Sequence, residues 1–108
     1  MPSDISVLRS LDLNALVVLV MVHRERNASR TAQLLGLTQP AVSNVLGKLR
    51  RLFDDPLFLR VGRGLVPTDR ANEIVKALEP AIQGVEEALD RYLRQAADVR
   101  ETFFLAVN

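Results

Sequence analysis

Residues 37–53, LTQPAVSNVLGKLRRLF, form one predicted helix with two different faces. Its apolar residues recur at the i, i+3, i+4, i+7 spacing of an amphipathic helix: Val42, Val45, Leu46, Leu49, Leu52 and Phe53. The opposite face carries Pro40, Ser43, Asn44, Gly47 and Arg51. A face that meets only water normally carries Glu, Lys and Gln, which favour the helix and stay hydrated. This face therefore indicates a contact surface, with a simply solvated face as the alternative.

Length and composition fit one small globular domain. The chain has 108 residues, of which 48% are hydrophobic and 25% are charged. The absence of cysteine excludes disulfides, thiolate metal sites and thiol nucleophiles. The longest strongly apolar run, residues 15–22, is far shorter than the roughly 20 residues of a membrane span. Because the N-terminal residues also lack the layout of a signal peptide, we expect a cytoplasmic protein with no membrane partner.

Charge is distributed unevenly along the chain, although the net charge is only +1. Residues 24–70 hold nine basic and four acidic side chains, whereas residues 71–108 hold four basic and seven acidic ones. Basic clusters often meet phosphate groups, and a solvated charged surface is the common alternative. The basic middle of the chain is therefore a candidate nucleic-acid surface.

Helix-boundary signals predict three helices in the first half of the chain. Asp12 is the expected N-cap of a first helix that is apolar over most of its circumference, which is typical of the buried centre of a small domain. Asn27 caps a second helix that stops at Gly36, and Thr38 caps the third. The third helix ends at Asp54–Pro56, because the residue before a proline is pushed out of the α region.

The second and third helices have the spacing of a helix-turn-helix. Counting from Ala28, the fifth residue is Ala32, which is small enough for two helices to touch, and the ninth is Gly36, which permits a sharp turn. The fifteenth and eighteenth residues, Val42 and Val45, are apolar and can pack the third helix on the second.

Residues 57–68 predict a β-hairpin behind these helices. Two β-prone runs, 57–61 and 65–66, bracket a glycine-rich tip at Gly62–Gly64. The expected fold class is therefore all-α with a small β-hairpin wing, a winged helix-turn-helix over residues 1–68.

Residues 69–97 predict a long helix. Its apolar residues alternate at spacings of four and three, as in a coiled-coil seam: Ala71, Val75, Leu78, Ile82, Val85, Leu89, Tyr92 and Ala96. Pro80 should kink or locally break this helix. Because such a stripe is too large to stay exposed, we expect a homodimer through Val75, Leu78, Ile82, Val85, Leu89 and Tyr92. Residues 101–108, ETFFLAVN, form a new strand-like run.

The small and polar start of the third helix suits the major groove of DNA, which is about 12 Å wide. Asn44 and Gln39 each carry a donor and an acceptor that can read adenine. The Ser43 hydroxyl can bond to either a donor or an acceptor on a base edge. The candidate base contacts are Gln39, Pro40, Ala41, Ser43 and Asn44. Lys48 and Arg51, further along the helix, are candidate phosphate contacts.

Other functional classes are weaker. His23 is the only histidine, it lies beside Arg24 and Arg26, and no catalytic triad, paired carboxylates or phosphate loop accompanies it, so we do not expect an enzyme or a metal site. A module that only dimerises through the long helix would leave the basic middle unexplained. RNA binding is a third option, although the chain lacks an aromatic platform for single strands.

Four segments in this order resemble the LysR-type transcriptional regulators of bacteria: LDLNALVVL (11–19), SRTAQLLGLTQPAVSNVLGKLRRLF (29–53), DPLFLRVGRGLVPT (55–68) and the long helix after them. The resemblance covers essentially the whole chain and looks closest to the nodulation and aromatic-acid-responsive branch. There are two departures: Thr31 replaces the alanine usual before Ala32, and TDRAN (68–72) replaces Thr-Glu-Ala-Gly.

The resemblance implies sequence-specific binding of double-stranded DNA by an activator or repressor. The helix at 38–53 would enter the major groove, and the wing at 57–68 would lie toward the minor groove with Arg60 and Arg63. The residues near phosphates would be Ser29, Arg30, Thr31, Thr38, Lys48 and Arg51. Residues 69–97 would dimerise, with a tetramer in the full-length protein, and 98–108 would begin an effector-binding domain. A small-molecule inducer would bind that domain, with no cofactor in this segment.

Overall fold

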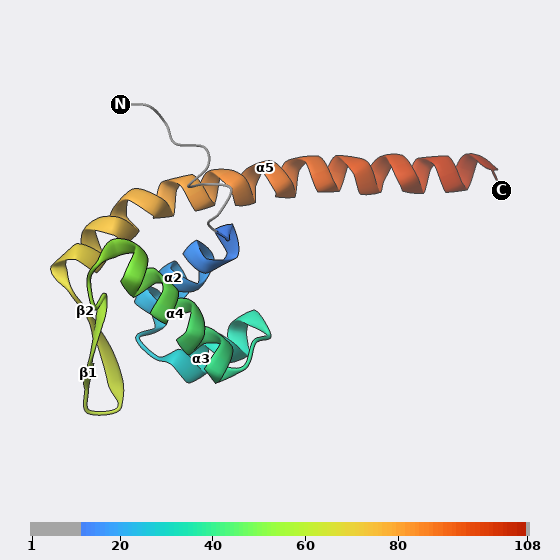
Figure 1. Cartoon of the computed structure of the whole chain (residues 1–108). Helices are drawn as coiled ribbons and strands as arrows, with labels where there is room; N and C mark the ends of the chain where they lie inside the picture. Colours follow the sequence, from blue (N-terminus) through green and yellow to red (C-terminus); the bar gives the residue numbers. More distant parts are fainter. Residues whose placement is uncertain (1–11, 108) are drawn as a thin grey trace. The chain divides into compact units, whose positions relative to one another are not determined.

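The computed structural model describes the backbone of residues 12–107 and the side chains of residues 12–97. Its elements are, in order, α2 (Leu13–Glu25), α3 (Ala28–Leu35), α4 (Gln39–Phe53), β1 (Phe58–Val61), β2 (Gly64–Pro67) and α5 (Asp69–Val107), as Figure 1 shows. The chain divides into two compact units, Met1–Leu78 and Glu79–Asn108. The predicted fold class, all-α with a small β-hairpin, is confirmed.

Helices α2, α3 and α4 begin at the predicted caps. The side chains of Asp12, Asn27 and Thr38 each accept a hydrogen bond from a backbone N–H in the first turn of their helix, at 2.9, 2.9 and 3.2 Å. These bonds satisfy N–H groups that have no partner within the helix. Local sequence chemistry therefore sets where each helix begins.

The turn between α3 and α4 depends on Gly36. Its φ of 68° lies in the left-handed region, which glycine enters without the steric cost that a Cβ imposes. Its N–H and that of Leu37 bond back to carbonyl groups at the end of α3, the latter to Ala32 O at 2.9 Å. This closure is a common way to end a helix, and it lets α4 start only three residues later, at Gln39.

Apolar side chains of α2 form the centre of the first unit, as predicted. Val18, Leu19 and Val22 are fully buried, and the residues that pack around them include Ala32, Val42, Leu46 and Leu49. The predicted stripe on α4 was too wide, because Leu52 is 47% exposed, and Val45 and Phe53 are half-buried. At 3.6 residues per turn, Leu52 lies about 80° from the centre of the buried stripe, at its edge.

The hairpin is antiparallel, with Phe58 opposite Pro67 and Val61 opposite Gly64. Its two-residue turn starts at Gly62, whose φ of 60° matches the first central position of a type II′ turn. The predicted wing is confirmed, although each strand differs by one or two residues from the predicted runs. The Leu65 N–H donates to the Arg26 carbonyl at 3.0 Å, which fixes the hairpin to the turn between α2 and α3.

Asp55 and Thr68 close the base of the hairpin. The Asp55 carboxylate accepts hydrogen bonds from the Thr68 hydroxyl at 2.7 Å and from the Leu57 N–H at 2.8 Å. These two bonds hold the pKa of Asp55 below its ordinary value of 3.8, and the bond from Thr68 has the larger effect. The same Thr68 hydroxyl oxygen accepts the Ala71 N–H at 3.1 Å, so one side chain joins the hairpin base to the first turn of α5.

Leu57 has an unusual backbone for a bulky residue. Its φ of 64° lies in the left-handed region, where a non-glycine side chain is strained, yet the side chain is fully buried. Both of its backbone groups are bonded, the N–H to Asp55 and the carbonyl to the Thr68 N–H at 2.9 Å. The surrounding bonds and the core together hold this conformation.

The first turns of α5 belong to the core of the first unit. Ala71 is fully buried and Val75 is only 2% exposed, while Leu78 is half-buried. The prediction that Val75 forms part of a dimer seam is therefore wrong, because the domain itself already covers this side chain. The coiled-coil spacing continues without interruption from core residues into the rest of the helix, so the pattern could not distinguish them.

In the second unit α5 is continuous, and Pro80 does not end it. The predicted helix end at residue 97 and the predicted strand-like run at 101–108 are wrong, because α5 runs to Val107. A strand needs a neighbouring strand for its backbone groups, whereas a helix satisfies them internally. The side chains of 98–108, together with residues 1–11 of the predicted first domain, lie outside the described residues. No helix in the described part of the chain is long and apolar enough to span a membrane.

The same substitution should have opposite effects at two glycines. Gly36→Ala should lower the free energy of unfolding by about 1–2 kcal/mol, because alanine is strained at φ 68°. Gly47→Ala should raise it by about 0.5–1 kcal/mol, because Gly47 is helical and the nearest atom to an added Cβ is Arg51 Nη1 at 3.8 Å. Urea unfolding of both variants checks this. Equal shifts of the same sign would contradict the assigned turn.

Asp55→Asn should destabilise the protein at pH 7, and the loss should shrink in acid. Because the folded-state pKa of Asp55 lies below its unfolded value of 3.8, the carboxylate contributes stability above that value. This contribution disappears as the pH falls through the folded-state pKa. Urea unfolding of both proteins at pH 7 and at about pH 3 measures the difference. If the two proteins differ in unfolding free energy by the same amount at both pH values, the charge on Asp55 does not contribute to this stability.

Candidate nucleic-acid interface

The first turns of α3 and α4 carry no acidic residue. Each helix N-terminus presents free N–H groups and the positive end of the helix dipole. The chain from Arg26 to Phe53 contains five basic residues and no acidic one. This part of the surface is therefore suited to an anionic partner.

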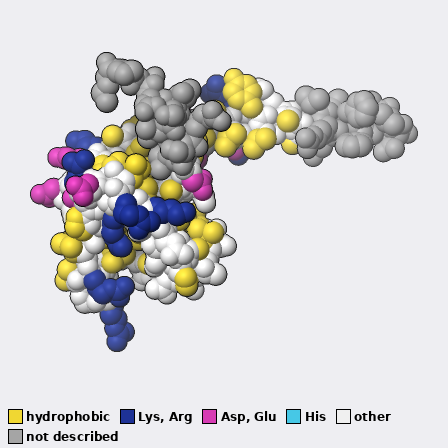
Figure 2. Space-filling model, viewed as in Figure 1, with side chains coloured by type: hydrophobic (Ala, Val, Ile, Leu, Met, Phe, Trp, Pro, Cys, Tyr) yellow, Lys and Arg dark blue, Asp and Glu magenta, His cyan; other side chains and the backbone are white. Residues whose placement is uncertain are grey.

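Basic side chains gather on one face of the first unit. Figure 2 shows Lys and Arg side chains over α4 and at the tip of the hairpin, while acidic side chains lie near the start of α5. The exposed basic residues on these elements are Lys48, Arg50, Arg51, Arg60 and Arg63. The uneven charge seen along the sequence is thus also uneven on the folded surface.

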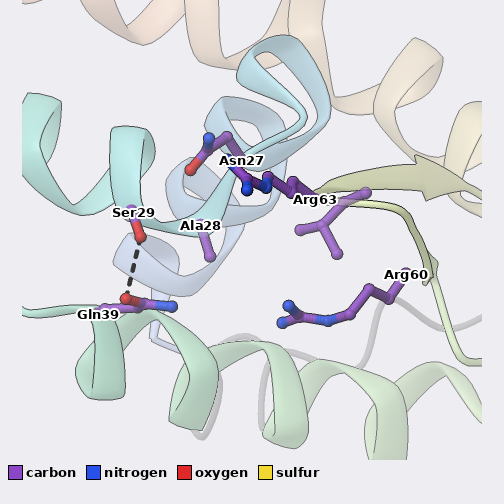
Figure 3. A pocket seen from close by; sticks show the side chains of 7 residues that line it. Asn27, Ala28, Ser29, Gln39, Arg60 and Arg63 are labelled. Carbon is purple, nitrogen blue, oxygen red and sulfur yellow. Dashed lines mark hydrogen bonds between the residues drawn. The ribbon is translucent and has the colours of Figure 1, made fainter.

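A polar concavity of about 120 Å³ lies where α3, α4 and the hairpin meet. Figure 3 shows its lining residues, which are Asn27, Ala28, Ser29, Gln39, Arg60, Arg63 and Leu65. The sequence analysis assigned Ser29, Gln39, Arg60 and Arg63 to three separate roles, and the structure brings them to one place. It missed Asn27 and Ala28, for which the cap at the start of α3 was the available signal.

Ser29 and Gln39 are hydrogen-bonded across this concavity. The Ser29 hydroxyl donates to the Gln39 carboxamide oxygen at 2.9 Å (Figure 3). Because its only hydroxyl proton is used here, Ser29 has none left to donate to a phosphate. Within the described residues, the amide nitrogen of Gln39 has no hydrogen-bond partner.

The candidate base contacts share the N-terminal half of α4. Their side chains are exposed at Gln39, Pro40, Ser43 and Asn44, and half-buried at Ala41. We call these five residues the reading face. Lys48 and Arg51 are exposed further along the same helix. Thr38 is exposed too, but its hydroxyl oxygen already accepts the Ala41 N–H as the N-cap.

Thr31 cannot contact a phosphate through its side chain, so this prediction is wrong. The side chain is fully buried, and its hydroxyl donates to the Asn27 carbonyl at 2.8 Å. Thr31 lies on the inner side of α3, next to the buried Ala32. Its neighbour Arg30 is exposed and lies 3.8 Å from the Glu25 carboxylate, an ion pair that solvent weakens.

The described part of the second unit presents an exposed apolar surface. Val85, Leu89 and Tyr92 are all more than half exposed. Leu93 is equally exposed and was missed, although it follows Leu89 at the i+4 spacing of one helix face. We call these four residues the α5 stripe.

Residues 13–72 match the family model described as bacterial regulatory helix-turn-helix protein, lysR family. The chain is 41% identical over 100 residues to the HTH-type transcriptional regulator LeuO of Escherichia coli strain K12. This match covers 93% of the chain but only 32% of LeuO, so the chain spans about a third of that relative.

Two solved structures share the fold. The probable transcriptional regulator PA0477 from Pseudomonas aeruginosa superposes with a TM-score of 0.73 at 40% identity, covering 79% of this chain and 28% of that one. The crystal structure of the CbnR_DBD–DNA complex superposes with a TM-score of 0.67 at 19% identity, covering 80% of this chain and 99% of that one.

Proposed function

Because the chain belongs to the lysR family of bacterial regulatory helix-turn-helix proteins, we propose that it binds double-stranded DNA sequence-specifically, as part of a transcriptional regulator. The observation that carries this proposal is the reading face at the start of α4. It is exposed except at the half-buried Ala41, free of acidic residues and bordered by basic side chains. The LeuO name and the DNA-bound CbnR_DBD neighbour support the same proposal.

In this proposal α4 lies in the major groove. Asn44 and Ser43 then meet base edges by hydrogen bonds, while Pro40 and Ala41 offer apolar contact for thymine methyl groups. Small residues matter here because a bulky side chain would hold the helix backbone away from the groove. The hairpin lies toward the minor groove, where Arg63 at its tip, assisted by Arg60, suits the negative potential of narrow A·T-rich stretches.

Phosphate contacts supply affinity rather than specificity. Lys48 and Arg51 extend from α4, and Arg30 can exchange its weak pair with Glu25 for a phosphate. The N-terminus of α3 adds backbone N–H groups to the same contact. Binding should therefore weaken steeply with added salt.

We also propose that the protein is a homodimer through the α5 stripe, extended by the half-buried Leu78 and Ile82. An exposed apolar stripe of this length is rare on a monomer. From family membership we propose four further properties of the full-length protein. It forms a tetramer, binds an inducer in a separate C-terminal domain, is not an enzyme and is located in the cytoplasm. The nodulation and aromatic-acid-responsive branch stays a prediction.

Asn44→Ala and Lys48→Ala should separate specificity from affinity. Asn44→Ala should cost about 1–3 kcal/mol on the preferred duplex and relax the preference at one base pair per half-site. Lys48→Ala should weaken binding to every duplex and lower the salt slope by about one unit. Arg51→Ala should behave like Lys48→Ala. Binding isotherms on selected and random duplexes at several salt concentrations measure both effects.

Neither substitution should change the melting temperature, because both side chains are exposed. A variant that loses different amounts of affinity for selected and random duplexes therefore does not do so because it unfolds. If Asn44→Ala weakens selected and random duplexes equally, the reading face does not read bases. If the wild-type protein shows no salt-dependent binding to any duplex, the proposed function is wrong. The alternative, a module that only dimerises through α5, is then the better explanation.

Leu89→Lys should disrupt the dimer. It places a charge in the α5 stripe, where dimerisation would bury it without a partner. We expect the dimer dissociation constant to rise at least about tenfold in sedimentation equilibrium. Glu87→Gln is the matched control, because it changes the charge by the same amount on the opposite side of the helix. A wild-type protein that stays monomeric at tens of micromolar would rule out this interface.

A further inference from the structure

We propose that Ser29 is a positioning residue that sets which base Gln39 reads. Its hydroxyl holds the carboxamide oxygen of Gln39, so that Gln39 presents N–H donors to the DNA. This inference rests on the proposed function and deepens it. It assigns to α3, the helix outside the groove, an effect on sequence preference that acts through Gln39.

The geometry of the two helix starts makes this bond possible. Ser29 lies in the first turn of α3, and Gln39 is the first residue of α4, directly after the Thr38 cap. The helix-turn-helix brings them together over ten residues of sequence, with 2.9 Å between the hydroxyl and carboxamide oxygens. The cap fixes the backbone of Gln39, and the Ser29 bond fixes the far end of its side chain. A glutamine with three rotatable bonds is thereby restrained at both ends.

The polarity of the bond determines what Gln39 can recognise. Figure 3 shows the amide oxygen turned toward Ser29 and the nitrogen turned away from it, toward the space that Arg60 also faces. In the major groove guanine offers two acceptors, adenine one acceptor and one donor, and cytosine a donor only. An amide that offers only donors therefore favours guanine and rejects cytosine. A freely rotating amide would instead bind adenine through both its oxygen and its nitrogen.

The surroundings leave the amide nitrogen available. The cationic neighbours in the concavity, Arg60 and Arg63, have only donors and cannot accept from it. The Asn27 carboxamide oxygen already accepts the Arg30 N–H at 2.9 Å. In the free protein water competes with the Ser29–Gln39 bond, since both side chains are exposed. A duplex that covers this surface removes that water, so the bond strengthens when it is needed.

Selection of bound duplexes from a random pool tests the inference. The wild-type protein should prefer guanine at the base pair that Gln39 meets. Ser29→Ala should shift the guanine-to-adenine ratio at that pair by about fivefold toward adenine, with the salt slope and melting temperature unchanged. Ser29→Thr keeps a hydroxyl and should keep the wild-type preference. A serine that contacts phosphate or only supports the fold would not produce this pattern.

A double substitution shows whether Ser29 acts through Gln39. Gln39→Ala should remove the preference at that pair, and adding Ser29→Ala to it should change nothing further. If the Ser29→Ala protein keeps the wild-type preference while Gln39→Ala loses it, the inference fails and the proposed function stands. A wild-type protein that selects no sequence overturns the proposed function and this inference together.

Discussion

The close contact between α3 and α4 is the constraint on which the interface depends. Ala32 is buried where the helices meet, and Gly36 makes the left-handed turn that lets α4 begin three residues later. A larger residue at Ala32 would push the helices apart, and any non-glycine residue at Gly36 would strain the left-handed turn; either change would move the two helix starts apart. That separation would break the Ser29–Gln39 bond and open the concavity, because both are formed between the first turns of these helices.

The parts of the fold that depend on neighbouring residues were predictable. Asp12, Asn27 and Thr38 bond to amides two or three positions away, so the sequence contains both partners of each cap. Thr31 shows the limit, because its burial depends on which side of α3 faces α2 and α4. Val75 fits the same spacing whether the domain or a second helix covers it. The Asp55–Thr68 and Ser29–Gln39 pairs have no local signature at all, since only folding joins them.

The surface separates two tasks that DNA recognition requires. Its basic side chains extend from α4 and the hairpin and can meet a phosphate of any sequence. The reading face contains only small, apolar and amide or hydroxyl groups, whose hydrogen bonds depend on the base that faces them. Because these sets occupy different parts of α4, affinity and preference can change independently. The length of α4, Gln39–Phe53, provides room for both.

Leu57 has a consequence for how this domain can change over evolution. Glycine would adopt the left-handed backbone at this position with the least strain, whereas a large aliphatic residue best fills the buried space that the side chain occupies. No single amino acid meets both demands: glycine would leave a cavity, and a β-branched residue of similar size would increase the strain. Leucine is therefore a local compromise. Improvement at this position requires simultaneous changes in the hairpin base, which makes the start of the wing resistant to stepwise redesign.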